Sequence, residues 1–242
     1  MDRRQFLTAG VAAAAVLATA DAALTPSPDS AAYAWPHGCI ERLPAFGSKR
    51  MAWTVDDGAS VTALRSYVDL LEKHDDLRMT MFVLAGAHSW KVLAKPLRAL
   101  AQTGQVQMAN HTLNHIDLTR ATNRKIKQEL VLTSRFIEDN FGVDPGPYWR
   151  PPYGYINQHV MKVAAEAGFD RPVLWYGSTA SNVGVSSATV WANCQKWMTN
   201  GRIVIDHANS QSTVNNFGRI RALLAARHLS TVTLTDAFGL LN

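Results

Sequence analysis

Residues 51–58 read Met-Ala-Trp-Thr-Val-Asp-Asp-Gly, an apolar run that ends in two adjacent carboxylates and a glycine. After this run, apolar side chains recur at helical spacing, at Val61, Leu64, Val68 and Leu71. An Asp-Gly pair between apolar runs is a common hairpin turn, but the helical pattern after Gly58 disfavours a hairpin. The stretch therefore predicts a strand followed by a helix, the building unit of parallel α/β folds.

The same alternation continues to the C-terminus. Further strands are predicted at residues 79–84, 106–109, 148–150, 172–175, 203–206 and 232–234. Helices are predicted around residues 92–101, 124–141, 157–167, 188–199 and 219–228. About seven β/α units in one chain indicate an α/β protein with a parallel sheet or an α/β barrel. In such folds ligands bind at the carboxyl ends of the strands, so functional residues are expected there.

Composition excludes several other protein classes. The 242 residues are 47% hydrophobic and 18% charged, which is unlike a disordered polyelectrolyte, and two cysteines cannot make a disulfide-dense miniprotein. No long apolar run follows residue 24, so a polytopic membrane protein is excluded and stable membrane insertion is not expected. The net charge of +5 is spread along the chain without a basic run, and we predict no nucleic-acid partner.

The first residues carry an export pattern. Arg3-Arg4, followed by Phe6-Leu7 and a short Ala-rich run to Ala20, is typical of a twin-arginine signal peptide over residues 1–22. An uncleaved N-terminal anchor is the alternative. Residues 23–48 are rich in Pro, Ser and Ala and are expected to form an extended arm before the folded domain at 49–242. Export predicts a periplasmic, extracellular or cell-wall location.

An oxidising compartment would permit a disulfide between Cys39 and Cys194, the two cysteines of the chain. However, Cys194 shares an apolar helical stripe with Val190 and Met198, where a buried free thiol is ordinary. The pairing stays open at this point.

Two predicted strand ends carry residues suited to a metal ion. Adjacent carboxylates at Asp56 and Asp57 repel each other unless a cation or an arginine compensates them. His111 and His115 have a spacing that would place both imidazoles on one side of a helical turn. Together these residues offer a two-histidine, one-carboxylate set with positions left for water and substrate.

Two further strand ends carry candidates for charge and proton transfer. Residues 149–154 read Trp-Arg-Pro-Pro-Tyr-Gly, and the prolines favour a rigid turn that leaves Arg150 facing the carboxylates. His207 follows the apolar run 203–205 and Asp206, where a proton-transfer role is credible.

These motifs, in this order and spacing, resemble the polysaccharide deacetylase (NodB-like) family, which is carbohydrate esterase family four. The resemblance covers roughly residues 49–236 and includes Met-Thr-Met-Phe at 79–82, which is similar to a strand of that family. It implies a distorted (β/α) barrel and the metal-dependent hydrolysis of acetyl groups on carbohydrates.

The resemblance also implies a role for each site residue. Asp57, His111 and His115 would hold a divalent metal, usually zinc. Asp56 would be the general base that takes a proton from the attacking water, and Arg150 would orient it.

In the same family, the position of His207 is that of the general acid which protonates the departing amine. The backbone N–H of Tyr153 would help to stabilise the oxyanion. Ile205 would line the pocket for the acetyl methyl group, and Trp175 would form another wall.

One segment departs from the family pattern. After the strand that ends at Trp175, the family has acidic residues and a tryptophan that support the catalytic histidine, whereas residues 176–182 read Tyr-Gly-Ser-Thr-Ala-Ser-Asn. His207 would therefore lack its acidic partner, because the neighbouring Asp206 should point to the opposite face of the strand. A compensating residue elsewhere, a less basic His207 or reduced activity would follow.

The leading hypothesis is a secreted N-deacetylase that acts on N-acetylglucosamine polymers of the peptidoglycan or chitin type. An O-acetyl esterase on xylan is a close alternative, because an alkoxide leaves more easily than an amine and tolerates a weaker acid. A catalytically silent carbohydrate-binding homologue is a third reading, although a pure binder has no need of a general base.

Overall fold

The computed structural model describes residues 36–45 and 47–239. Its strands are β1 (Arg50–Asp57), β2 (Met79–Val83), β3 (Val106–Asn110), β4 (Tyr148–Trp149), β5 (Arg171–Pro172), β6 (Gly177–Ser178), β7 (Ile203–His207) and β8 (Ser230–Thr231). Its α-helices are α1 (Val61–Lys73), α2 (His88–Val92), α3 (Ala94–Gln102), α4 (Asn123–Phe141), α5 (Gln158–Ala165), α6 (Ser187–Trp197), α7 (Gln211–Val214), α8 (Phe217–Ala226) and α9 (Leu234–Phe238). Two short 3₁₀ helices are η1 (Leu118–Arg120) and η2 (Pro152–Gly154).

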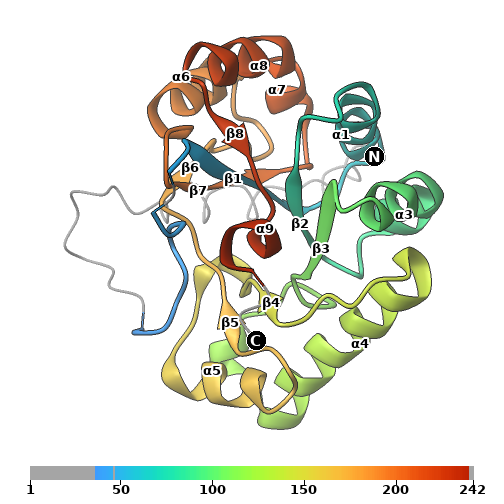
Figure 1. Ribbon diagram of the computed structural model, residues 1–242. Helices are drawn as coiled ribbons and strands as arrows, with labels where there is room; N and C mark the ends of the chain where they lie inside the picture. The colour runs from blue at the N-terminus through green and yellow to red at the C-terminus, as the bar shows by residue number, and fades with distance from the viewer. Residues whose placement is uncertain (1–35, 46, 240–242) are drawn as a thin grey trace, which may run out of the picture.

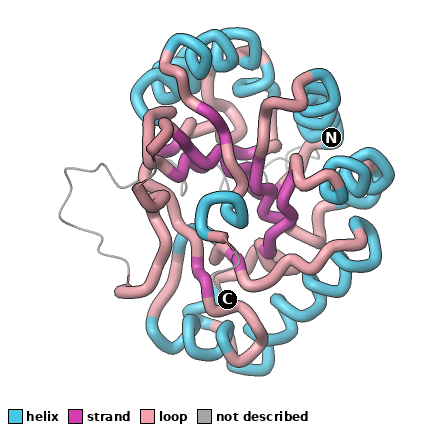
Figure 2. Tube along the Cα trace, viewed as in Figure 1, coloured by secondary structure: helices cyan, strands magenta, loops and turns pink. Residues whose placement is uncertain are grey.

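The strands form one parallel sheet in the order β5-β4-β3-β2-β1-β7-β6, and β8 pairs with the start of β1. Figure 1 shows the sheet curled upon itself with helices packed around its outside, and Figure 2 shows the same arrangement by secondary structure. The architecture is a distorted (β/α) barrel built on one parallel sheet, which confirms the fold expected from the sequence.

The central strand β1 separates two apolar layers. Its odd positions, including Trp53 and Val55, pack in the cluster beneath the outer helices, whereas Ala52 packs in the cluster inside the barrel. Because side chains alternate along a strand, Asp56 continues the inner row. Both faces of β1 are buried, which explains why its sequence is a nearly continuous apolar run.

Two segments close the barrel. In the described part of the N-terminal arm, Ile40 forms a parallel bridge to Val173 beyond β5, and Arg42 forms an antiparallel bridge to Arg202 beside β7. At the other end of the chain, α9 covers the amino ends of the strands (Figure 1), where its first N–H, of Leu234, donates to the Thr80 hydroxyl. The carboxyl ends of the strands are left as the open end.

The strand expected at 232–234 is wrong. The last strand is β8 at Ser230–Thr231, and Thr233 caps α9 by accepting from the backbone N–H of Asp236. The Asp236 carboxylate accepts in return from the Thr233 N–H, so this stretch forms a capping box, a local signal that overrides the short apolar run. The helix expected at 92–101 corresponds to α3, and the separate short helix α2 ends at Val92.

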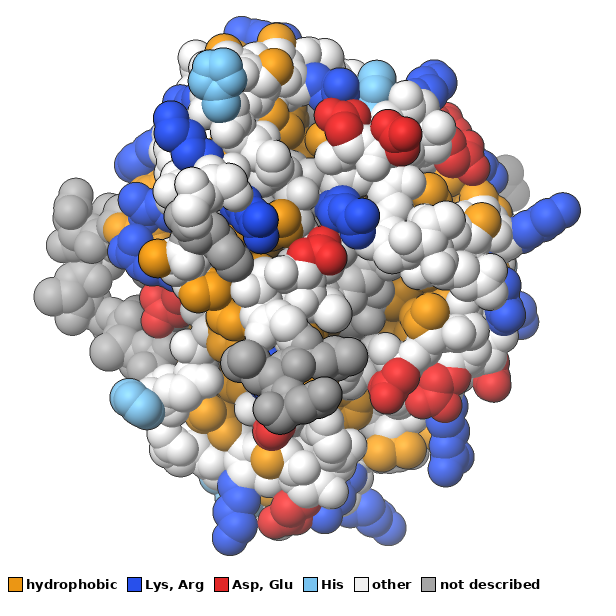
Figure 3. Space-filling view, in the orientation of Figure 1, with side chains coloured by type: hydrophobic (Ala, Val, Ile, Leu, Met, Phe, Trp, Pro, Cys, Tyr) orange, Lys and Arg blue, Asp and Glu red, His pale blue; other side chains and the backbone are white. Residues whose placement is uncertain are grey.

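Both cysteines are free thiols, and Cys194 is fully buried on α6 as its apolar stripe indicates. Among the described residues, no helix is long and apolar enough to cross a membrane. Basic and acidic side chains both occur around the face that carries α9 (Figure 3). The predicted signal peptide at 1–22, and the arm up to residue 35, lie outside the described residues.

Candidate active site

The carboxyl end of β1 presents two adjacent carboxylates with different surroundings. Asp56 is almost completely buried, whereas Asp57 turns into the left-handed region with φ 64°. The turn is held by Trp90, whose Nε1 donates to the Asp57 carbonyl at 2.7 Å. A Cβ at Gly58 would lie 2.6 Å from the Trp90 ring, and φ there is +68°, so this position requires glycine.

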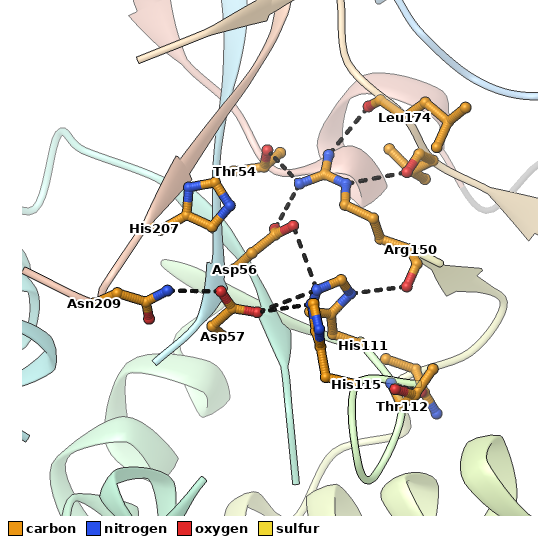
Figure 4. Close-up of polar contacts among 12 residues, drawn as sticks. Thr54, Asp56, Asp57, His111, Thr112, His115, Arg150, Leu174, His207 and Asn209 are labelled. Carbon is orange, nitrogen blue, oxygen red and sulfur yellow. Dashed lines mark hydrogen bonds and ion pairs between the residues drawn. The ribbon is translucent and has the colours of Figure 1, made fainter. Parts of the chain in front are cut away.

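Arg150 is the buried counter-charge of Asp56 (Figure 4). Its Nη1 donates to the Asp56 carboxylate at 2.6 Å and to the Thr54 hydroxyl at 2.9 Å. Its other nitrogens donate to the Val173 and Leu174 carbonyls, so the guanidinium is fixed on all sides. Burial lowers the pKa of Arg150, and the charge of Asp56 opposes this shift. The guanidinium is thus placed to compensate a negative charge on the buried Asp56 carboxylate.

Asp57, His111 and His115 form a compact set of potential metal ligands. Each offers one atom, and these atoms all lie within 4.8 Å of one another. The Asp57 Oδ1 atom is 3.3 Å from His111 Nε2 and 3.5 Å from His115 Nε2, yet it accepts no hydrogen bond. A buried carboxylate oxygen between two imidazole nitrogens suits a divalent cation, and this donor set is one that zinc accepts.

The tautomer of His111 follows from its backbone partner. Its Nδ1 lies 2.8 Å from the Arg150 carbonyl oxygen, which can only accept, so Nδ1 carries the hydrogen. In the neutral ring, Nε2 then has its lone pair on the side of Asp57, as a metal ligand requires.

The electrostatics of this set are strongly coupled. Burial by itself would raise the pKa of Asp57, but His111, His207 and His115 hold it well below its ordinary value. Burial likewise opposes the charged form of His111, and the two carboxylates raise its pKa instead. A cation bound between these groups would replace the protons that the histidines otherwise attract.

His111 and His115 do not lie on a helical turn as the spacing suggested. They belong to the irregular loop after β3, in which Thr112 and His115 have φ values of 69° and 53°. Asn110 also shapes this loop, because its side-chain oxygen accepts from the Thr112 N–H at 2.9 Å. A four-residue spacing can bring two imidazoles together through a tight loop as well as through a helix.

Glu129 on α4 holds this loop and was not identified from the sequence. The side chain is fully buried, and its Oε2 accepts from the backbone N–H groups of Leu113 and Asn114 at 2.9 and 2.7 Å. Its Oε1 accepts from the Asn114 side chain, and Lys125 lies 2.8 Å away. One glutamate among the many polar residues of a long helix gives no sequence signal for such a role.

Asn209 holds the Asp57 side chain and was likewise missed. Its Nδ2 donates to Asp57 Oδ2 at 2.7 Å, and its Oδ1 accepts from the Ala59 N–H at 2.9 Å. This bond occupies one carboxylate oxygen and leaves the other, Oδ1, facing the histidines (Figure 4). Asn209 lies two residues after His207 in the chain, and that proximity is the one signal that could have suggested it.

His207 ends β7 directly opposite Asp56, its register partner on β1. It lines the same pocket as Asp56, His111 and His115. No carboxylate hydrogen-bonds its ring within the described residues. The Asp206 side chain lies on the other face of β7, as expected from strand alternation, and it accepts from Trp53 and Tyr67 in the outer layer.

The pocket at this end of the barrel is a small cavity of about 40 Å³. The structure brings the three predicted substrate contacts, Tyr153, Trp175 and Ile205, to its walls. Tyr153 has a left-handed backbone, φ 62°, and its ring stands edge-on to the His115 ring. Asn182 and Ser178 also line the pocket and were not predicted. Seven of the nine predicted site residues therefore line this cavity, and the other two, Asp57 and Arg150, contact residues that line it.

Comparison with known proteins identifies related sequences. The polysaccharide deacetylase family model matches residues 44–172. A peptidoglycan-N-acetylglucosamine deacetylase, PgdA of Listeria monocytogenes, is 27% identical over 199 residues, which are 79% of this chain and 39% of that protein. Chitin deacetylase 1 of Cryptococcus neoformans var. grubii is 36% identical over 137 residues, which are 55% of this chain and 27% of that protein.

A solved structure shows the same fold. It is a mutant of a family 4 carbohydrate esterase (CE4) pseudoenzyme of Bacillus anthracis, described as having restored enzymatic activity. The TM-score is 0.71 at 20% identity, with 82% of this chain and 70% of that chain covered.

This chain spans about two fifths of the length of the Listeria relative and about a quarter of the length of the Cryptococcus relative.

Proposed function

Because this chain belongs to the polysaccharide deacetylase family, we propose that it is an exported, metal-dependent deacetylase that removes N-acetyl groups from N-acetylglucosamine polymers of the peptidoglycan or chitin type. One observation carries the proposal. The buried Asp56 carboxylate is paired with Arg150 and lies 3.7 Å from His111 of the Asp57–His111–His115 set. A protein that only bound sugar would gain nothing from an ionised carboxylate kept beside a cation site.

Asp57, His111 and His115 would hold the cation, with zinc the favoured ion. When bound, the cation supplies a positive charge that lowers the pKa of a nearby water and polarises an acetyl carbonyl. The chain's own residues do the remaining work. Asp56 takes the proton of the attacking water, and the hydrogen bond from Arg150 holds the carboxylate in place for that transfer.

The pocket walls position the acetyl group. Ile205 and Trp175 offer apolar surface for the methyl group, and the N–H of Tyr153 would donate to the carbonyl oxygen as negative charge develops on it. His207 would give a proton to the nitrogen as the C–N bond breaks and its electron pair stays on nitrogen. The products are acetate and a free amine.

Two features support the choice of polymer and place. The relatives with matching sequence include proteins named for peptidoglycan and for chitin. The twin-arginine pattern and the net charge of +5 fit a protein sent to an anionic cell wall.

Acetate release by the zinc-loaded protein tests the proposal. The substrates are N-acetylglucosamine oligomers, peptidoglycan and acetylated xylan, and Asp56→Asn serves as the inactive control. Release from the amide substrates that is lost in Asp56→Asn is the expected result. Release from xylan alone would favour the O-acetyl esterase, and no release with stoichiometric zinc bound would favour a silent sugar-binding homologue.

A further inference from the structure

Asp206 is a fully buried carboxylate that the proposed reaction does not use. Its two oxygens accept five hydrogen bonds, from Trp53 Nε1, Tyr67 OH, Thr179 Oγ1, Thr213 Oγ1 and the His207 backbone N–H. No basic side chain among the described residues forms an ion pair with it. A charge held in this way is compensated by fixed dipoles alone, so the surrounding hydroxyls are tightly oriented.

Thr179 connects Asp206 to Ser181. Its hydroxyl lies 2.7 Å from Asp206 Oδ1 and 3.0 Å from Ser181 Oγ. The hydroxyl has one proton, and the carboxylate is both the closer and the charged acceptor. Thr179 is thereby anchored to the outer layer while it contacts Ser181, which stands beside the pocket.

Ser181 is buried and contacts His207 at two points. Its Oγ accepts from the His207 backbone N–H at 2.8 Å and lies 3.4 Å from the ring atom Nδ1. When His207 is protonated, Nδ1 carries a hydrogen, and the Ser181 oxygen is the acceptor beside it. The other ring nitrogen, Nε2, then remains for the pocket that His207 lines.

We propose that Ser181, anchored through Thr179 to Asp206, is the positioning residue of His207 and stands in for the carboxylate that this part of the chain lacks. The inference rests on the proposed deacetylase function. A neutral hydroxyl orients the imidazole so that Nε2 delivers its proton to the departing nitrogen. Asp206 acts on the His207 ring indirectly, through the hydroxyl of Thr179 and then that of Ser181.

The test exploits the difference between leaving groups. Departure of an amine requires a proton from His207, whereas an aryl acetate such as 4-nitrophenyl acetate releases a stabilised phenolate without one. For Ser181→Ala we expect the kcat for N-acetylglucosamine oligomers to fall about 10- to 100-fold, because a misplaced acid loses part of its contribution. The KM for the oligomers and the kcat for the aryl acetate should change less than about threefold.

Two further variants distinguish a loss of positioning from a general loss of structure. Ser181→Thr retains the hydroxyl and should restore most of the amide activity, and Thr179→Val should lower that activity with the same selectivity but less severely. Ser187→Ala removes a hydroxyl that contacts Asn215 and not His207, and it serves as the matched control. Thermal unfolding and zinc stoichiometry are measured for every variant.

The outcomes separate the two proposals. If the unchanged protein releases no acetate from amides, the proposed function is wrong. If it does, and Ser181→Ala loses amide and ester activity equally or loses neither, the role of Ser181 is overturned while the function stands. The same holds if Ser181→Thr is as impaired as Ser181→Ala with both folded, because the hydroxyl would then have no part in positioning.

Discussion

The two sides of the pocket are supported by different chemistry. On one side, Asp57 and the histidine loop are held by an amide and a charged carboxylate, Asn209 and Glu129. On the other side, His207 is contacted by the neutral hydroxyl of Ser181, and the buried carboxylate of Asp206 lies on the far face of β7. Figure 4 shows His207 and the two loop histidines on opposite sides of Asp56.

The two sides need different supports because they have different tasks. A cation site requires ligand atoms that are fixed in position and that carry negative charge. Supporting side chains whose hydrogen-bonding groups are all satisfied hold the ligand atoms in this way. A proton donor must gain and lose its charge in each turnover, and a neutral support favours neither form as strongly as an adjacent carboxylate would. Substitutions on the first side should therefore lower zinc affinity, and those on the second side should lower proton donation to the leaving group.

The largest effect is expected from Asp57→Ala. Loss of the one carboxylate among the three ligand atoms should weaken zinc binding more than about 100-fold, because even a supporting partner is worth 10- to 100-fold. Amide and aryl ester activity should fall together, since both depend on the cation. Titration calorimetry with zinc measures the affinity directly. Zinc bound with unchanged affinity would show that the cation lies elsewhere.

His207→Ala should separate the two sides. We expect a loss of about 10²- to 10⁴-fold in kcat for the amide substrates, which is the usual contribution of a positioned acid. Zinc affinity should stay within a fewfold, because His207 is not among the three ligand atoms. The aryl acetate should still be cleaved. Equal loss on both substrates would assign His207 to the cation side of the pocket.

Asn209→Ala tests whether the amide support matters to the cation. Without the 2.7 Å bond from Asn209, the Asp57 carboxylate can rotate, and zinc affinity should fall about 10- to 100-fold. Asn215→Ala, which removes an exposed amide on the same segment, is the control. If Asn209→Ala binds zinc like the unchanged protein, the orientation of Asp57 is set by the backbone turn alone.

These supports also show where sequence reasoning stops. Asp56, Asp57, His111, His115, Arg150 and His207 stand at strand ends, and the alternation of strands and helices places all strand ends at one edge of the sheet. Their convergence was therefore predictable. Glu129, Asn209 and Ser181 act through loop conformation, and loop conformation depends on individual hydrogen bonds that leave no periodic trace.

The missing carboxylate after Trp175 is an instructive case. Strand alternation correctly predicted that Asp206 would point away from the site. It could not predict that Thr179, which follows β6, would reach the same carboxylate at 2.7 Å while also contacting Ser181. Side-chain direction is a local property of a strand, whereas the path of a hydrogen-bond network depends on which strands are neighbours.

The smallest effect, on stability rather than chemistry, is expected from Glu129→Gln. In the native protein, N–H donors bond to both oxygens of Glu129. The substitution places an NH₂ group opposite some of these donors, and we expect the free energy of unfolding to fall by about 1–3 kcal/mol at pH 7. Urea unfolding of the zinc-free protein measures it. Glu138→Gln, on the exposed side of the same helix, should cost little.

The pH dependence of that loss distinguishes charge from shape. Although burial acts in the opposite sense, bonds from Lys125 and Asn114 lower the pKa of Glu129 below its ordinary value. A carboxyl group with a lowered folded-state pKa stabilises the fold fully above its unfolded pKa of about 4.3, and loses that contribution as the pH falls through the folded pKa. The difference between the unchanged protein and Glu129→Gln should thus be constant from pH 7 to about 5 and shrink below about pH 4. A difference that persisted undiminished at pH 3 would mean that the shape of the side chain, and not its charge, holds the histidine loop.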